Sequence, residues 1–204
     1  DGKVISYKAP FKRLPILDAI KEKTGYDLTG LSEEEIRDIA INKLKMESVD
    51  ESFGKGKLID EIFGEYCESD FVQPTFITDY PVEMSPLTKM HRSKPGLTER
   101  FELMVNGKEL ANAYSELNDP IDQEQRFVDQ MQLADKGDDE AMVIDYDFLR
   151  SLQYGMPPTS GIGIGIDRLV MLMTANEYIQ EVMPFPQLKP EAKMPQSSVK
   201  EWAA

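Results

Sequence analysis

The chain has 204 residues, of which 41% are hydrophobic and 29% are charged, and its formal net charge is −14. This balance is typical of a globular domain, and no apolar run reaches the roughly 18 to 20 residues that a membrane span requires. Proteins that bind nucleic acid through their own surface usually carry basic patches, so the composition argues against an autonomous nucleic-acid-binding module.

The N-terminal third predicts three helices. Residues 14–24 place apolar side chains on one side of a short amphipathic helix. Ser32 followed by Glu35 forms a capping box, which opens a second helix. After a glycine-rich break, a third helix spans about residues 57–69 and contains Cys67, the single cysteine. Because this cysteine lies at helical spacing from apolar residues, we expect a buried structural thiol in a reducing compartment.

The middle of the chain changes to strand patterns. Residues 74–80 are rich in β-branched and aromatic residues and predict a strand. Residues 88–97 predict an exposed loop, in which His91 is an ordinary surface side chain. Residues 99–105 and 108–117 are joined by Asn-Gly, which indicates a β-hairpin because a type I′ turn needs positive φ at both central positions.

The C-terminal part predicts more helices around one more strand. Residues 119–136 predict a helix that begins at Asp-Pro and faces the interior with Ile121, Val128 and Met131. A short helix, a strand and another helix follow in that order, at 145–154, 159–166 and 167–174. Helices flanking an antiparallel set of strands indicate an α+β fold. We expect one domain over residues 1–190 and a poorly ordered tail over 191–204.

Three glycines, Gly161, Gly163 and Gly165, alternate with isoleucines along the predicted strand at 159–166. Because strand side chains alternate, the glycines share one face, whose bare backbone admits the close approach of a flat ligand. The isoleucines are expected to anchor the other face to the core. Arg168 then begins the next helix, where its guanidinium can reach a phosphate or stack on a base. The glycines lie in the strand itself, so this is not a dinucleotide-binding fingerprint.

The residues at 161–168, Gly-Ile-Gly-Ile-Gly-Ile-Asp-Arg, resemble motif 3 of the class II aminoacyl-tRNA synthetases. The preceding Gly-Met-Pro-Pro-Thr-Ser at 155–160 resembles the lysine-specific members of that class. So do Asn-Ala-Tyr-Ser-Glu-Leu-Asn-Asp-Pro at 112–120 and Gln-Pro-Thr-Phe-Ile-Thr-Asp-Tyr-Pro-Val-Glu-Met-Ser-Pro-Leu at 73–87. The resemblance to lysyl-tRNA synthetases covers about residues 8–190.

The resemblance implies a ligase that activates lysine with ATP, and it assigns roles to single residues. Arg168 is the motif 3 arginine, expected to contact ATP at the adenine and the γ-phosphate. Gly163 and Gly165 are expected to floor the pocket shared by lysine and the nucleotide. Glu102 and Glu109 match the metal-binding glutamates of the family, and carboxylates that bracket a tight hairpin suit Mg²⁺ on ATP phosphates.

The resemblance also implies a lysine pocket made by Asn112, Tyr114 and Glu116, which alternate and so share one strand face. Glu116 would bind the ε-ammonium, Tyr114 would pack along the aliphatic stem, and Asn112 would hold the α-carboxylate end. Regular alternation puts Glu109 on the opposite face. A common site therefore requires a β-bulge near Leu110–Ala111, and we predict one there.

Motif 1 and motif 2 of the family have no counterpart in this sequence. The anticodon-binding domain of the family has none either. We therefore expect the C-terminal part of a catalytic domain that is weakly active or inactive alone. For the full-length enzyme the resemblance implies a cytoplasmic homodimer that charges tRNA(Lys) and has no membrane partner.

Three alternatives remain open. The paralogue that lysylates elongation factor P usually has alanine in place of Gly163 and histidine in place of Ser115. A non-enzymatic synthetase-like domain would be suggested by loss of motif 3 or of the glutamates, but Glu102, Glu109 and Arg168 are present. Aspartate- and asparagine-specific relatives share motif 3, although an acidic residue at the position of Glu116 suits a cationic substrate better.

Overall fold

The computed structural model describes residues 2–135 and 142–187, and the predicted tail at 191–204 lies outside them. The chain divides into two compact units, Asp1–Ile164 and Gly165–Ala204, and each is described by itself. No helix in the described ranges is long and apolar enough to cross a bilayer.

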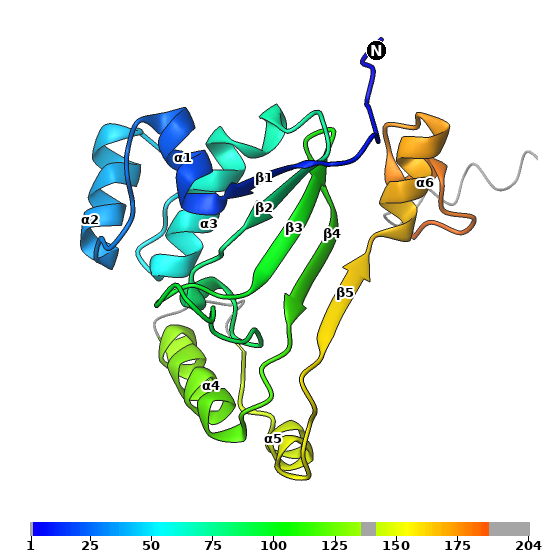
Figure 1. Cartoon of the computed structure of the whole chain (residues 1–204). Coiled ribbons are helices and arrows are strands. Elements are labelled where there is room, and N and C mark those ends of the chain that lie inside the picture. The colour runs from blue at the N-terminus through cyan, green and yellow to red at the C-terminus, as the bar shows by residue number, and fades with distance from the viewer. Residues whose placement is uncertain (1, 136–141, 188–204) are drawn as a thin grey trace, which may run out of the picture. The chain divides into compact units, whose positions relative to one another are not determined.

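A five-stranded sheet forms the centre of the first unit (Figure 1), and its strands are arranged in chain order. They are β1 Lys12–Pro15, β2 Thr75–Thr78, β3 Arg100–Val105, β4 Lys108–Ser115 and β5 Ser160–Ile164. β1 pairs with β2 in parallel, and the three other pairs are antiparallel. This mostly antiparallel sheet with its helices agrees with the predicted α+β fold.

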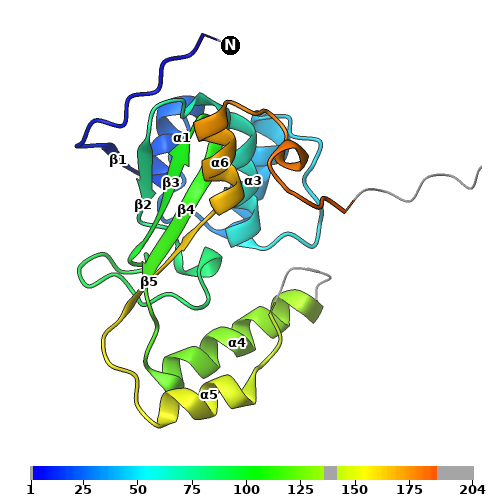
Figure 2. The same cartoon turned by 90° about the vertical axis from the view of Figure 1, so that its right-hand side faces the viewer.

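Three helices cover one side of β1, β2 and β3 (Figures 1 and 2): α1 Ile16–Thr24, α2 Glu33–Asp38 and α3 Lys55–Tyr66. The predicted capping box is present at α2, where Ser32 Oγ accepts from the Glu35 amide and Glu35 accepts from the Ser32 amide. α2 continues into a π-helical turn, Ile39–Lys43, and a short 3₁₀ turn, Glu68–Asp70, follows α3. The first predicted helix begins two residues late, because Leu14 and Pro15 extend β1 along β2.

An apolar core fills the space between these helices and the sheet. It includes Leu14, Ile16, Ile20, Ile36, Leu58, Ile59, Ile62, Ile77 and Met104, each less than a tenth exposed. Cys67 belongs to this core, and burial raises the pKa of its thiol to about 11. The predicted structural thiol is therefore confirmed.

The predicted hairpin is formed by β3 and β4, and both turn residues adopt positive φ, 54° at Asn106 and 70° at Gly107. A 3₁₀ turn, Val82–Met84, lies between β2 and the loop that leads to β3. The prediction that His91 is an ordinary exposed side chain in this loop is wrong. Its side chain is only 17% exposed, because it packs against Asp79 and the loop backbone.

α4 Pro120–Asp135 and α5 Tyr146–Gln153 pack together beyond the end of β4 (Figure 2). The predicted inward face of α4 is wrong, since Ile121 is 79% exposed and Val128 and Met131 are also exposed. The buried stripe is instead Gln123, Arg126 and Phe127. The two polar side chains donate to the Pro86 and Ser85 carbonyls, so hydrogen bonds to a neighbouring loop decided the orientation of the helix.

The isoleucines of the glycine-rich strand do not anchor it to a core as predicted. Ile162 and Ile164 are 61% and 50% exposed, and Ile166 is 62% exposed. β5 is an edge strand of the described sheet, and within that sheet it pairs with β4 alone. In the second unit, α6 Ile166–Thr174 is followed by a 3₁₀ turn, Ile179–Glu181.

Candidate functional site

The hairpin contains the predicted bulge. Leu103 pairs with Ala111 and Met104 pairs with Glu109, so Leu110 is the additional residue on β4. Paired residues share a face of the sheet, and so do residues two apart on one strand. Glu109 therefore lies on the face that carries Glu102 and its partner Asn112. Without the bulge, the two carboxylates would be on opposite faces.

The rest of the predicted lysine pocket lies on this same face, which we call the acidic face and define by Glu102, Glu109, Asn112, Tyr114 and Glu116. Asn112 pairs with Gly163 and Tyr114 pairs with Gly161, so the bare side of β5 continues it. Glu116 follows two residues after Tyr114, and its amide donates to the Thr159 carbonyl.

The glycines of β5 have different surroundings. A Cβ atom placed on Gly161 would collide with the Glu116 carboxylate, whereas one on Gly163 would meet only the Asn112 carbonyl, at 3.9 Å. Gly161 therefore gives Glu116 room to lie over the strand. Burial raises the pKa of Glu116 above its ordinary value, and the described structure gives this carboxylate no ion pair. Glu116 also borders a cavity of about 550 Å³ with Lys89, Thr159 and Ser160.

Glu102 is a largely enclosed carboxylate of the acidic face, with 15% of its side chain exposed. Burial raises its pKa, the guanidinium of Arg100 opposes that rise, and the negative charge of Glu109 adds to it. Asp60 of α3 is close enough to interact, and its pKa is also raised, chiefly by burial.

Two carboxylates that repel each other across a bulge fit a divalent cation, which would remove the repulsion. No group of three or more histidine, cysteine, aspartate or glutamate side chains in the described ranges could hold a metal by itself. A cation at Glu102 and Glu109 would therefore need further ligands from a substrate such as a phosphate, as is usual for Mg²⁺. The residues present fit Mg²⁺ bound together with ATP.

Arg100, which the sequence interpretation missed, lies at the centre of the acidic face. Its guanidinium forms an ion pair with Glu102, donates to Asn112 Oδ1, and stands 4.4 Å from the centre of the Tyr80 ring. The position could have been found from the sequence, because Arg100 and Glu102 are two residues apart in a predicted strand and so share a face.

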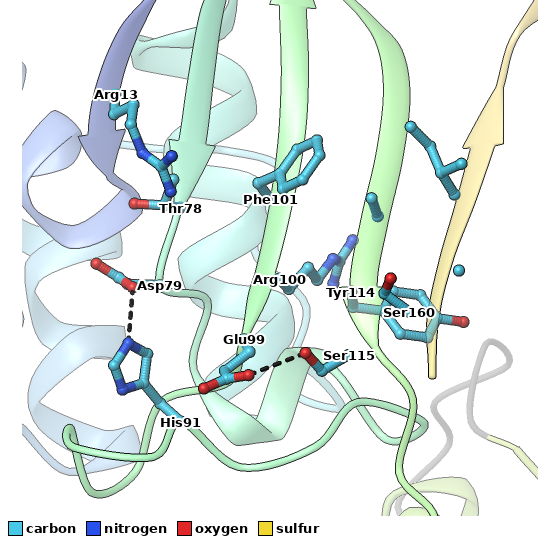
Figure 3. A pocket seen from close by; sticks show the side chains of 13 residues that line it. Arg13, Thr78, Asp79, His91, Glu99, Arg100, Phe101, Tyr114, Ser115 and Ser160 are labelled. Atoms are coloured by element: carbon cyan, nitrogen blue, oxygen red, sulfur yellow. Dashed lines mark hydrogen bonds and ion pairs between the residues drawn. The ribbon is translucent and has the colours of Figure 1, made fainter. Parts of the chain in front are cut away.

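The opposite face of the sheet carries a cavity of about 500 Å³ (Figure 3). Arg13, Thr78 and Phe101 project into it from β1, β2 and β3, and Ala113 and Ile162 add apolar wall. Arg100, Tyr114 and Gly161 also line this cavity at its edge, so it borders one residue of the predicted lysine pocket. Glu102, Asn112 and Glu116 do not line it, because Phe101 and Ala113 alternate with the acidic residues along their strands.

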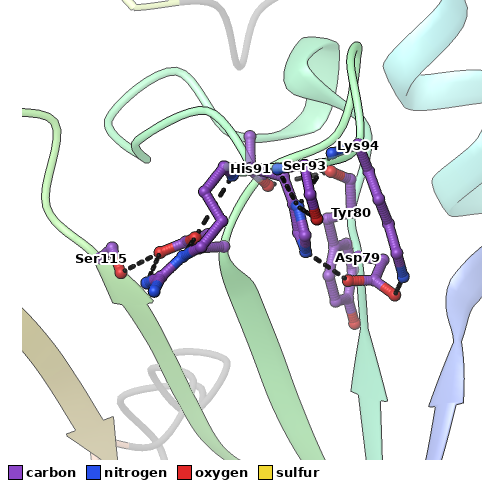
Figure 4. Close-up of polar contacts among 9 residues, drawn as sticks. Asp79, Tyr80, His91, Ser93, Lys94 and Ser115 are labelled. Atoms are coloured by element: carbon purple, nitrogen blue, oxygen red, sulfur yellow. Dashed lines mark hydrogen bonds and ion pairs between the residues drawn. The ribbon is translucent and has the colours of Figure 1, made fainter.

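The rim of that cavity is a set of ion pairs that fasten the loop at 88–98 to the sheet (Figure 4). Asp79 forms an ion pair with Lys94 Nζ at 2.7 Å, and its other carboxylate oxygen lies 3.6 Å from His91 Nε2. Glu99 binds Arg92 and accepts from Ser115 Oγ, and these donors lower its pKa to about 2. His91 therefore helps to hold the loop against Asp79.

The remaining predicted site residues belong to the second unit. Gly165 is the N-cap of α6, and Arg168 lies in its first turn with an exposed side chain. A Cβ atom on Gly165 would be in ordinary contact with the Arg168 side chain, at 3.4 Å. The role of Arg168 stays a prediction from the motif.

Comparison with known proteins gives two results. A family model described as tRNA synthetases class II (D, K and N) matches residues 1–189. Among curated proteins, the chain is 64% identical over 202 residues to a protein named lysine–tRNA ligase from Porphyromonas gingivalis strain W83. That match covers 99% of this chain and 35% of the relative.

Two further relatives have the same name. The one from Christiangramia forsetii is 65% identical over 197 residues, which are 97% of this chain and 34% of that protein. The one from Azobacteroides pseudotrichonymphae is 60% identical over 188 residues, which are 92% and 37%. The chain thus spans about a third of the length of the curated relatives it matches.

Proposed function

Because this chain belongs to the class II tRNA synthetases of the D, K and N group, we propose that it supplies the lysine- and ATP-binding surface of a lysine–tRNA ligase. One observation supports the proposal above all others. The bulge at Leu110 brings a pair of carboxylates and an Asn, Tyr and Glu set onto one face, beside a strand with two bare glycines. Such a face suits a small cationic ligand next to a phosphate-bound cation.

The proposed reaction begins with lysine activation. The lysine carboxylate, already ionised near neutral pH, attacks the α-phosphorus of ATP, and the bond to pyrophosphate breaks. No general base is needed, so the protein contributes positions and charges. Glu116 binds the ε-ammonium, Tyr114 packs along the stem, and Asn112 holds the α-carboxylate. Gly161 leaves Glu116 its room above the strand.

ATP would be held by Glu102 and Glu109 through Mg²⁺, by Gly163 and Gly165 through close backbone approach, and by Arg168 at the adenine and the γ-phosphate. When bound, Mg²⁺ would offset negative charge on the phosphates as pyrophosphate departs. Arg168 enters this proposal from the motif alone. In the whole enzyme, which we propose is a cytoplasmic homodimer, the lysyl group would then pass to a terminal hydroxyl of tRNA(Lys), the bond to the α-phosphate would break, and AMP would leave.

The test uses the full-length polypeptide that contains this chain and measures ATP–pyrophosphate exchange with lysine, ornithine and arginine. Exchange should depend on lysine, with ornithine and arginine much weaker. Glu116→Gln should raise the KM for lysine about thirtyfold with little change in the KM for ATP, because a charge-assisted contact is lost. Exchange supported equally by a neutral amino acid of similar length would contradict the proposal.

A second assay separates the ligase from the related alternative. The same polypeptide is given ATP, labelled lysine and either tRNA(Lys) or elongation factor P. Label should pass to tRNA(Lys), in keeping with Gly163 and Ser115 in this chain. Label passing only to the protein acceptor would favour the paralogue. The isolated chain should catalyse exchange far more slowly than the full-length polypeptide.

A further inference from the structure

Arg100 has its donors engaged on every side. Nε donates to Asn112 Oδ1 at 3.2 Å, Nη1 donates to the Met84 carbonyl at 2.9 Å and to Ser85 Oγ at 3.1 Å, and Nη2 pairs with Glu102. The Arg100 side chain is 16% exposed. A guanidinium fixed by this many partners cannot turn toward a ligand without losing several hydrogen bonds.

The contact with Asn112 decides which way its amide points. An asparagine amide offers an acceptor on one side and two donors on the other, and either side can face a ligand. Arg100 donates to the acceptor, Oδ1, and the amide nitrogen donates one of its two hydrogens to Glu102 Oε1 at 3.4 Å. With Oδ1 and one N–H engaged, the group that Asn112 has left for a ligand on the acidic face is its second N–H, a donor, which is what a carboxylate needs.

The anchors of Arg100 come from outside the hairpin. Met84 and Ser85 belong to the turn after β2, and the Tyr80 ring lies under the guanidinium. This turn reaches Asn112 only through Arg100, since no hydrogen bond in the described structure joins it to Asn112 directly. A lysine at this position would keep the positive charge beside Glu102. It would lack the planar fork that reaches Asn112 and the turn together.

We infer that Arg100 is a positioning residue for the amino acid substrate, acting through Asn112. It fixes the Asn112 amide so that the second N–H of the nitrogen can be donated to the lysine α-carboxylate, while its charge offsets that of Glu102. The inference rests on the proposed function, because it assumes that lysine binds on the acidic face. It adds a residue that touches no substrate and yet decides the affinity for lysine.

The test measures lysine-dependent ATP–pyrophosphate exchange in the full-length polypeptide with Arg100→Lys, Asn112→Ala and the double variant. Arg100→Lys should raise the KM for lysine about tenfold and leave the kcat and the KM for ATP within about twofold, because the charge remains and the orienting hydrogen bond is lost. In the Asn112→Ala background, Arg100→Lys should change the KM for lysine by less than about twofold.

The controls separate the possible failures. Arg150→Lys alters an exposed arginine that pairs with Asp147 on α5, and it should change no kinetic constant. If Arg100→Lys does not fold, Ser85→Ala removes one anchor and should raise the KM for lysine about threefold, again only when Asn112 is present. Equal effects with and without Asn112, or no change in the KM for lysine, would overturn the inference. Absence of lysine-dependent exchange in the unmodified polypeptide would instead overturn the proposed function.

Discussion

One face of the sheet serves two different purposes in its two halves. Under α1 and α3, Leu14, Ile77 and Met104 are buried in the core. On the same face, farther along the sheet, Glu102 and Asn112 are polar and only partly buried, and of the glycines on β5 Gly161 is partly buried and Gly163 is exposed. Ile77 pairs directly with Glu102, and Met104, two residues after Glu102 on the same strand, is in the core, so the boundary crosses β3.

The acidic face is held in place by the packed half of the same sheet. The packed half supplies the apolar burial that stabilises the sheet, and the open half can then have glycines, a bulge and close carboxylates that contribute little to stability. If this division is correct, substitutions in the packed half change stability, and substitutions in the open half change lysine binding.

The largest effect is expected from the packed half. Ile77→Ala should lower the free energy of unfolding of this chain by about 3 kcal/mol, because a fully buried side chain leaves a cavity. Urea denaturation measures this loss. The matched control is Ile121→Ala on α4, where the side chain is 79% exposed and the loss should stay below about 0.5 kcal/mol. Similar losses in both variants would break the comparison.

A substitution in the open half should change lysine binding and leave the stability nearly unchanged. Gly161→Ala puts a methyl group where the Glu116 carboxylate lies, so the carboxylate must move. The KM for lysine of the full-length polypeptide should rise about tenfold, while the free energy of unfolding should fall by no more than about 0.5 kcal/mol, because alanine suits a strand better than glycine. Gly163→Ala has more room and should leave the stability equally unaffected. A large loss of stability with an unchanged KM would contradict the division.

The smallest effect concerns the opposite face and depends on pH. Glu99 has its pKa lowered from 4.5 to about 2, with Arg92 as the main cause, so its ionised form stabilises the folded chain. That contribution is complete above about pH 4.5 and is lost as the pH falls toward 2. Glu99→Gln should therefore destabilise the chain by about 1 kcal/mol at pH 6, since the exposed Arg92 weakens the pair, and by less at pH 3. Urea denaturation at both values checks this, and a constant difference would sink the assignment.

Local patterns predicted most of the elements but not the way some of them face. The capping box at Ser32 and the Asn-Gly turn were correct because both depend on a few neighbouring residues. The bulge at Leu110 was predicted only because the motif roles required one face for Glu109 and Asn112. The orientation of α4 was wrong, because hydrogen bonds from Gln123 and Arg126 to residues far away in the chain outweighed its apolar pattern.

The sequence by itself determined the hairpin, the alternation of glycines and the presence of the acids on neighbouring strands, since these follow from spacing and periodicity. It also indicated the family, through the resemblance of its motifs. The tertiary structure alone decided that Lys12–Pro15 form an edge strand, that His91 is enclosed, and that Arg100 fixes the Asn112 amide. Each of these depends on partners distant in the chain. Long-range pairing of backbone or charged groups leaves no periodic signal in the segments that take part in it.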